Sequence, residues 1–138
     1  MRLDPYISLR FDGRCEVAFE FYERCLGGSI LFKLTWGDSP LAKSAPADWG
    51  GKILYARLAI GDTALLGADA LPNTYEPPRG FAVLLEAGDQ SDTERVFQAL
   101  SENGTVHMPL QETFWALRYG ILTDQFGIPW EIHCEKPQ

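Results

Sequence analysis

The feature that most constrains this fold is an order of strand, helix, glycine and strand that occurs twice along the 138-residue chain. One shift along the sequence aligns the two copies at three places: Phe21 with Phe97, Gly28 with Gly104, and Ile30 with Val106. Such a repeat indicates one supersecondary unit used twice. We therefore predict two βαβββ modules, about residues 1–70 and 79–138, in a single domain over residues 1–138.

The first copy begins with side chains that alternate between polar and apolar, which is the period of a strand with one buried face. The segment CEVAFEFYERCL then places apolar residues at helical spacing, Val17 and Phe21 among them, and Gly27 and Gly28 form a typical helix stop. Gly61 and Asp62 suit a tight turn between two strands. The predicted elements are strands over 5–11, 29–36, 52–60 and 63–68 and a helix over 15–26.

The second copy repeats this order, with acidic and hydroxyl residues at the start of its helix and Gly104 at its end. Two segments rich in Pro, Gly, Asp and Ser, residues 37–51 and 69–80, are predicted loops. Long loops in compact domains are often functional. The predicted elements are strands over 80–87, 105–110, 116–123 and 129–135 and a helix over 89–103.

The expected fold class is α+β. One helix cannot cover both faces of a four-stranded sheet, so two modules with their helices outside leave curved inner faces. These curved mixed sheets would enclose a cleft, and ligand sites favour such concavities. Candidate functional residues are therefore sought on the inner faces.

Composition limits the partners of this chain. Lys and Arg number 12 against 19 Asp and Glu, a net charge of -7, so we expect no nucleic-acid partner. Charges interrupt the N-terminal apolar residues and no uncharged apolar run spans a bilayer, which predicts a soluble, cytoplasmic protein without a membrane partner. The three cysteines, Cys15, Cys25 and Cys134, lack C-x-x-C spacing and are predicted to be reduced thiols.

Two segments carry a family resemblance: PYISLRFDGRCEVAFEFYERCLGG near the start and GTVHMPLQETFWALRYGILTDQFGIPWEIHCE near the end. Both resemble the PhnB-like branch of the vicinal-oxygen-chelate superfamily, which includes glyoxalases, extradiol dioxygenases and bleomycin- or fosfomycin-resistance proteins. The resemblance implies the glyoxalase/bleomycin-resistance fold and a homodimer. Branch members often carry a methyltransferase label, but this chain has no Gly-rich strand-to-helix turn for a methyl donor, so methyl transfer is not expected.

The resemblance also implies a divalent metal held by side chains on the first, fourth, fifth and eighth strands. The residues at these positions are, in order, Tyr6, Leu66, Phe81 or Ala82, and Glu131. Only Glu131 is a good metal ligand. The branch often has a His and an acidic residue on its third strand, where this chain has Tyr55 and Arg57, and a guanidinium repels a cation. We therefore expect no bound metal at these positions and no cofactor, with a divalent metal held by another ligand set as the disfavoured alternative.

Alternation along strands selects the candidate site residues. Tyr6, Ser8 and Arg10 share one strand face, as do Tyr55 with Arg57 and Glu131 with His133. Glu131 and His133 are the catalytic candidates, because a neighbouring carboxylate would orient an imidazole that titrates near neutral pH. The alternatives are a hydrogen-bonded strand histidine, and for Glu131 a buried ion pair with Arg57. Arg57 and Glu131 are expected to interact in either case.

The segment FWALRY adds an aromatic and basic cluster that can stack on a planar ligand and hold its anionic group. The alternative is that these aromatic residues belong to the core. Together with the strand residues above, the ligand-binding candidates are Tyr6, Tyr55, Arg57, Trp115, Arg118 and Tyr119.

Three functions remain open from the sequence, which leaves undecided whether the protein is an enzyme. The first is a metal-independent binding protein for a small aromatic or anionic molecule. The second is a metal-dependent lyase, isomerase or dioxygenase of the same superfamily, which uses Glu131 with another ligand set, or Glu131 and His133 for proton transfer. The third is an interaction protein whose cleft has closed.

Overall fold

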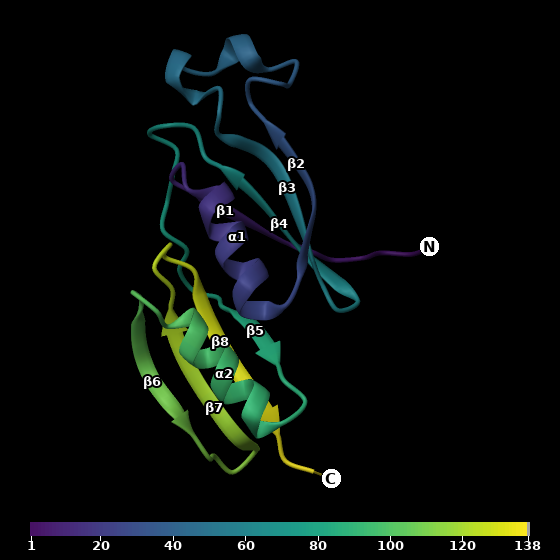
Figure 1. The fold of residues 1–138 in the computed structure, drawn as a ribbon, viewed down its shortest axis with the longest axis vertical. Coiled ribbons are helices and arrows are strands. Elements are labelled where there is room, and N and C mark those ends of the chain that lie inside the picture. The colour runs from purple at the N-terminus through teal and green to yellow at the C-terminus, as the bar shows by residue number, and fades with distance from the viewer. Residues whose placement is uncertain (138) are drawn as a thin grey trace. The chain divides into compact units, whose positions relative to one another are not determined.

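The computed structural model describes residues 1–137, and the chain divides into two compact units, Met1–Glu76 and the segment from Pro77 onward. Each unit contains one four-stranded sheet and one α-helix (Figure 1). The α+β class and the two βαβββ modules predicted from the sequence are confirmed. Neither of the two α-helices in residues 1–137 has the length and apolar character needed to cross a membrane.

Unit one has the strand order β1-β4-β3-β2, in which β1 runs parallel to β4 and the other neighbours are antiparallel. Gly27 adopts a left-handed conformation and ends the helix. Two short 3-10 turns lie within the predicted loop 37–51. The elements are β1 (Ile7–Phe11), α1 (Cys15–Leu26), β2 (Ser29–Thr35), β3 (Ile53–Ile60) and β4 (Thr63–Asp69).

The core of unit one lies between α1 and one face of the sheet. Phe11 of β1 meets Phe19 of α1 edge to face, with ring centroids 6.0 Å apart. Gly67 of β4 makes room for this ring, because a Cβ there would lie 2.6 Å from Cζ of Phe19. The expectation that Val17 belongs to the buried stripe is wrong, since its side chain is 58% exposed. The helix turns Phe19 rather than Val17 toward β4, where the glycine leaves space.

Unit two has the strand order β5-β8-β7-β6, with β5 parallel to β8 and the other neighbours antiparallel. The carboxylate of Asp89 caps its helix by accepting a hydrogen bond from the Asp92 backbone N–H at 2.7 Å. Trp130 and Ile132 of β8 are fully buried on the helix side. The elements are β5 (Val83–Glu86), α2 (Gln90–Leu100), β6 (Thr105–Gln111), β7 (Ala116–Thr123) and β8 (Pro129–Glu135).

Two predicted elements differ most from the structure, and both are shorter than expected. The strand predicted over 80–87 pairs with β8 only from Val83 to Glu86, and Gly80 before it has a positive φ of 79°. The helix predicted over 89–103 ends at Leu100, because Asn103 adopts a left-handed φ of 57° before the next strand.

The repeat seen in the sequence has a packing basis at its glycines. A Cβ on Gly28 would press against the Ala59 carbonyl oxygen, and a Cβ on Gly104 would do the same at the Thr123 carbonyl oxygen. Both glycines therefore let the chain enter β2 or β6 close to the neighbouring strand. The same steric demand explains why a glycine stands at both aligned positions.

A buried aspartate in each unit binds backbone N–H groups. Asp69 accepts hydrogen bonds from the N–H groups of Gly13, Cys15 and Ile53, at 2.8 to 3.0 Å. In unit two, Asp124 accepts from the backbone of Phe126 and Ile128 and from the Trp130 indole. These carboxylates connect loops to strands through otherwise unsatisfied donors.

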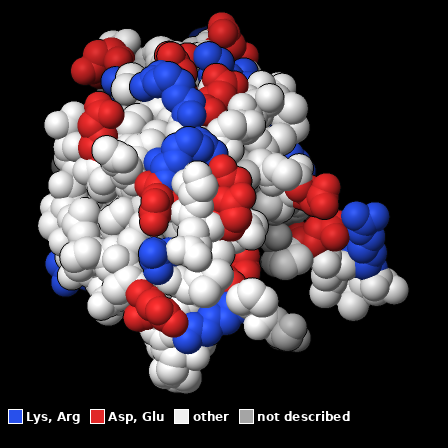
Figure 2. Space-filling model, turned by 60° about the horizontal axis from the view of Figure 1, so that its bottom comes forward, with Lys and Arg blue, Asp and Glu red and all other residues white. Residues whose placement is uncertain are grey.

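The cysteines and surface charges complete the fold. All three cysteines are free and buried, as predicted, and burial raises the pKa of the Cys15 thiol, with the charges of Asp69 and Glu16 adding to the shift. Such a thiol is a weak nucleophile at neutral pH. On the face shown in Figure 2, acidic and basic side chains are interspersed.

Candidate functional site

The face of the unit-one sheet opposite α1, which we call the open face of unit one, contains three predicted ligand-binding residues. Arg57 alternates with the buried Ala56 and Leu58 and donates a hydrogen bond to the Tyr6 hydroxyl at 3.1 Å. Its guanidinium lies 4.8 Å from the centroid of the Tyr6 ring. Hydrogen bonds to Tyr6 and Tyr55 raise the pKa of Arg57. The structure thus brings these three residues together around a permanent positive charge.

Unit one also contains a cavity of about 490 Å³. Arg10 lines it and alternates with the buried Leu9 and Phe11, which places its guanidinium on the open face. The indole N–H of Trp36, another lining residue, is buried and has no hydrogen-bond partner among residues 1–137. The full lining is Arg10, Trp36, Leu54, Ala68, Asp69, Ala70, Leu71, Thr74 and Glu76.

This cavity was only partly visible in the sequence. Strand alternation placed Arg10 on the same face as Tyr6, but it gave no reason to prefer Arg10 as a ligand residue. Trp36 follows the last residue of β2, where the chain enters the loop 37–51. Its backbone N–H bonds the Lys52 carbonyl, which brings the two ends of that loop together beside the cavity.

The corresponding face of unit two, opposite α2, is here called the open face of unit two. The Tyr119 hydroxyl donates a hydrogen bond to the Glu131 carboxylate on the neighbouring strand. Burial raises the pKa of Tyr119 to about 12, and the hydrogen bond and negative charge of Glu131 add to the shift. The Trp115 ring lies 5.3 Å from the Tyr119 ring and the His133 ring 6.2 Å from it. Four predicted site residues therefore form one cluster.

Arg118 is not part of this cluster. Its side chain points to the other face of β7, where its Nε lies 3.5 Å from a carboxylate oxygen of Glu94 in α2. It also donates to the Leu117 carbonyl at 2.7 Å. Strand alternation separates Arg118 from Tyr119, so the structure does not bring the predicted cation and the aromatic rings together. The predicted ligand contact of Arg118 stays a prediction.

The expected interaction of Arg57 with Glu131 also stays a prediction. The two residues belong to different units, and each has a partner in its own unit: Tyr6 for Arg57 and Tyr119 for Glu131. His107, the other histidine, forms a hydrogen bond between its Nε2 and the Thr123 hydroxyl, and the two atoms lie 2.8 Å apart.

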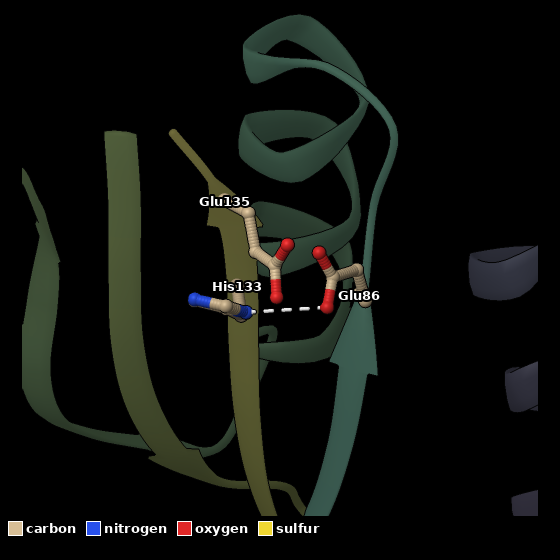
Figure 3. A group of neighbouring side chains, drawn as sticks. All are labelled: Glu86, His133 and Glu135. Carbon is tan, nitrogen blue, oxygen red and sulfur yellow. Dashed lines mark ion pairs between the residues drawn. The ribbon is translucent and has the colours of Figure 1, made fainter. Parts of the chain in front are cut away.

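His133 belongs to a second group on the open face of unit two. Glu86, His133 and Glu135 each direct one potential metal-ligand atom toward the others, and these atoms lie within 4.8 Å of one another (Figure 3). The His133 Nδ1 is 3.4 Å from Oε2 of Glu86. His133 is buried, at 8% exposure, whereas both glutamates are exposed. We call this group the Glu86–His133–Glu135 cluster.

Sequence reasoning did not identify the two glutamates of this cluster. Alternation could have found Glu135, since it shares the parity of Glu131 and His133 on one strand. Glu86 is different, because it reaches His133 only through the parallel register of β5 against β8, in which the two residues are partners. Nothing local in the sequence fixes that register.

The four superfamily metal positions do not fit a metal in this chain. Leu66 and Phe81 have no lone pair to offer. The Tyr6 hydroxyl accepts a hydrogen bond from the Arg57 guanidinium, and this permanent positive charge disfavours a cation beside Tyr6. Glu131 alone remains, and its carboxylate accepts from Tyr119. One carboxylate is too few, because transition-metal sites generally use three or four protein ligands.

Comparisons with known proteins agree with this fold. The family model of the Glyoxalase/Bleomycin resistance protein/Dioxygenase superfamily matches residues 4–132. The chain is 34% identical to Protein YjdN of Escherichia coli K12, over 100% of this chain and 98% of that protein. The crystal structure of protein PA1353 from Pseudomonas aeruginosa is 42% identical, with a TM-score of 0.90 and coverage of 99% of this chain and 100% of that one.

A more distant structure shows the fold alone. The putative 3-demethylubiquinone-9 3-methyltransferase, PhnB protein, from Bacillus cereus is 18% identical, with a TM-score of 0.77 and coverage of 96% of this chain and 99% of that one. Three findings agree on the family of this chain. They are the two sheets with one helix each, the family-model match over residues 4–132, and the relatives at 34% and 42% identity. The chain belongs to the glyoxalase/bleomycin resistance protein/dioxygenase superfamily.

Proposed function

We propose that this protein is a cytoplasmic, homodimeric small-molecule-binding protein that holds a small aromatic or anionic ligand without a metal at the four superfamily positions. The observation that carries this proposal is the cavity of about 490 Å³ in unit one, with Arg10 and the unpartnered Trp36 indole N–H in its lining. Its volume falls in the range of sites for small ligands.

The lining chemistry selects the ligand class. Arg10 keeps its positive charge at physiological pH and can form two parallel hydrogen bonds to a carboxylate or phosphate. Trp36 offers an aromatic face and a buried donor, and an unsatisfied buried donor costs about 1–3 kcal/mol until a ligand acceptor reaches it. Leu54 and Leu71 supply apolar surface for the rest of the molecule. A planar organic anion uses Arg10, Trp36 and these leucines, with its charge directed away from the carboxylates of Asp69 and Glu76, which also line the cavity.

The experiment uses three matched probes: benzoate, phenyl phosphate and the neutral benzyl alcohol. Both anions should raise the melting temperature of the protein in proportion to their binding, and the alcohol should raise it less. Arg10→Gln should weaken binding of both anions at least tenfold, since a charge-assisted hydrogen bond is worth about 1.5–3 kcal/mol. Arg24→Gln, an exposed arginine on α1, is the control and should leave binding unchanged.

The proposal is wrong if neither anion binds at millimolar concentration, or if Arg10→Gln and Arg24→Gln behave alike. Tryptophan fluorescence gives an independent signal, because a ligand beside Trp36 changes the environment of its indole. Trp36→Phe should remove most of that signal and weaken binding, as it deletes the donor while it keeps an aromatic ring.

A second candidate function is a metal-dependent lyase, isomerase or dioxygenase, and the Glu86–His133–Glu135 cluster favours it. Glu131 and His133 remain its proposed catalytic residues, with Glu131 as the proton-transfer group and His133 as a metal ligand. Repeating the probe titration with added zinc or manganese distinguishes the two functions. Affinity that is independent of metal supports the binding protein, whereas probe binding that requires metal supports the enzyme.

A further inference from the structure

We propose that Glu86, His133 and Glu135 bind one divalent transition-metal ion on the open face of unit two. This site goes beyond the proposed ligand binding and uses none of the four superfamily metal positions. It lies within unit two, on the edge strand β5 and on β8. Glu86 and His133 are partners in the pairing of these two strands, and Glu135 follows His133 by two residues on β8.

The geometry of the cluster suits a metal. One imidazole nitrogen and two carboxylate oxygens lie within 4.8 Å of one another (Figure 3). Around zinc, with bonds of about 2.0–2.1 Å, neighbouring ligand atoms are about 3.4 Å apart. The 3.4 Å between Nδ1 of His133 and Oε2 of Glu86 already has this value. Both glutamates are exposed, so rotation of their side chains can close the remaining distance.

The burial of His133 is an independent reason to expect a ligand. Its side chain is nine-tenths buried, and neither ring nitrogen has a hydrogen-bond partner among residues 1–137. The contact of Nδ1 with Glu86 lacks hydrogen-bond geometry. Buried polar groups are normally satisfied, so an imidazole in this state, directed toward two carboxylates, requires a partner. A metal ion bonded to Nδ1 provides one.

Charge favours a cation over a simple ion pair. Two ionised carboxylates face one imidazole, so the cluster stays negative even when the imidazole carries a proton. A divalent ion bound by a neutral imidazole and two carboxylates leaves the group without net charge. The cluster itself, which consists of Glu86, His133 and Glu135, contains no arginine. It differs in this from the superfamily position at Tyr6, where the Arg57 guanidinium opposes a metal.

The ligand set indicates which ions bind. An imidazole favours zinc, nickel and iron, while carboxylates extend the range to manganese. Three protein ligands leave at least one coordination position for water or a small molecule. Cys134 lies between His133 and Glu135 in sequence but points into the core, with 2% exposure, so a thiolate ligand is not expected. Nitrogen and oxygen ligands alone should therefore hold the ion.

The test measures metal binding to the tag-free full chain. The protein is dialysed against trace zinc, nickel and manganese, its metal content is measured by elemental analysis, and zinc affinity is measured by calorimetry. We expect about one ion per chain. Glu86→Gln and Glu135→Gln, both at exposed positions, should each weaken zinc binding at least tenfold. His133→Gln should abolish it, with circular dichroism as the check on folding.

Two matched variants serve as controls. Glu102→Gln changes an exposed glutamate of unit two outside the cluster, and His107→Ala removes the other histidine. Both should keep wild-type zinc affinity. The proposal is overturned if less than half an ion binds per chain, if the glutamine variants at 86 and 135 bind as the wild type does, or if Glu102→Gln alone releases the ion.

Cobalt substitution gives a second readout. A cobalt ion held by one imidazole and carboxylates should show visible ligand-field bands without the intense near-ultraviolet band of a sulfur–cobalt bond. That sulfur band would show a cysteine ligand and contradict the proposed ligand set.

Discussion

The Tyr119 hydroxyl donates a hydrogen bond to the Glu131 carboxylate across the pair formed by β7 and β8. This contact connects the aromatic cluster of unit two to the single superfamily metal position that retains a carboxylate. Because both groups lie on the open face, each can respond to what binds there. The pKa of the Tyr119 phenol also depends on the charge of Glu131.

The first prediction concerns alkaline pH. Burial and Glu131 raise the pKa of Tyr119 from 10.0 to about 12. A raised pKa of a neutral acid means that the folded state favours the protonated phenol. Its contribution to stability is therefore complete below pH 10 and is lost as the pH rises through 12.

Ultraviolet absorbance of phenolate measures this titration, and Tyr119→Phe identifies the contribution of Tyr119 among the five tyrosines. Glu131→Gln should lower the pKa of Tyr119 but leave it above the ordinary tyrosine value of 10.0, because burial is the largest cause. An unchanged titration in Glu131→Gln would show that the carboxylate does not act on the phenol.

The second prediction is that Trp115 provides an aromatic contact on the open face of unit two, separate from the cavity of unit one. Trp115 is 45% exposed and is supported from one side by the Tyr119 ring, so it offers a fixed stacking surface. Trp115→Ala should weaken binding of benzoate or phenyl phosphate to this face by at least about 1 kcal/mol, the scale of a partly buried aromatic contact, and should leave binding in the unit-one cavity unchanged. Calorimetry measures the change at each site. Wild-type affinity in a folded variant would limit Trp115 to packing against Tyr119.

The third prediction concerns stability. Asp69 is 2% exposed and accepts from three backbone N–H groups. Asp69→Asn replaces one acceptor oxygen by an amide that faces a donor, so it should lower the free energy of unfolding by about 2–4 kcal/mol. Urea denaturation measures this loss. Asp62→Asn, in the exposed β3–β4 turn, is the control and should change stability little; equal effects would contradict the role of Asp69.

The fourth prediction is a homodimer. The edge strand β2 exposes Leu31 and Phe32, at 62% and 48%, and an exposed apolar edge favours a covering partner. Light scattering at micromolar concentration should give twice the mass of one chain. A protein that stays monomeric there would contradict this prediction and remove any site shared between two chains.

Most of the fold follows from local signals. The bounds of α1, β7 and β8 match the sequence prediction because period-2 and helical periodicity record which face each segment buries. For the same reason, the sequence could predict that Arg10 lies on the sheet face opposite the helix and that Cys134 is buried. Val17 shows the limit of this reasoning, since helical spacing allowed it in the buried stripe and only Gly67, opposite Phe19, selected the face that packs.

By itself, the sequence determined the element order, the duplicated module and the superfamily positions that lack metal ligands, because these depend on residue type and short-range periodicity. The tertiary structure decided which side chains meet. Glu86 and His133 are far apart in sequence and become neighbours through the parallel register of β5 and β8. Strand pairing over such distances depends on the packing of the whole sheet, so the Glu86–His133–Glu135 cluster emerges only when the chain is folded.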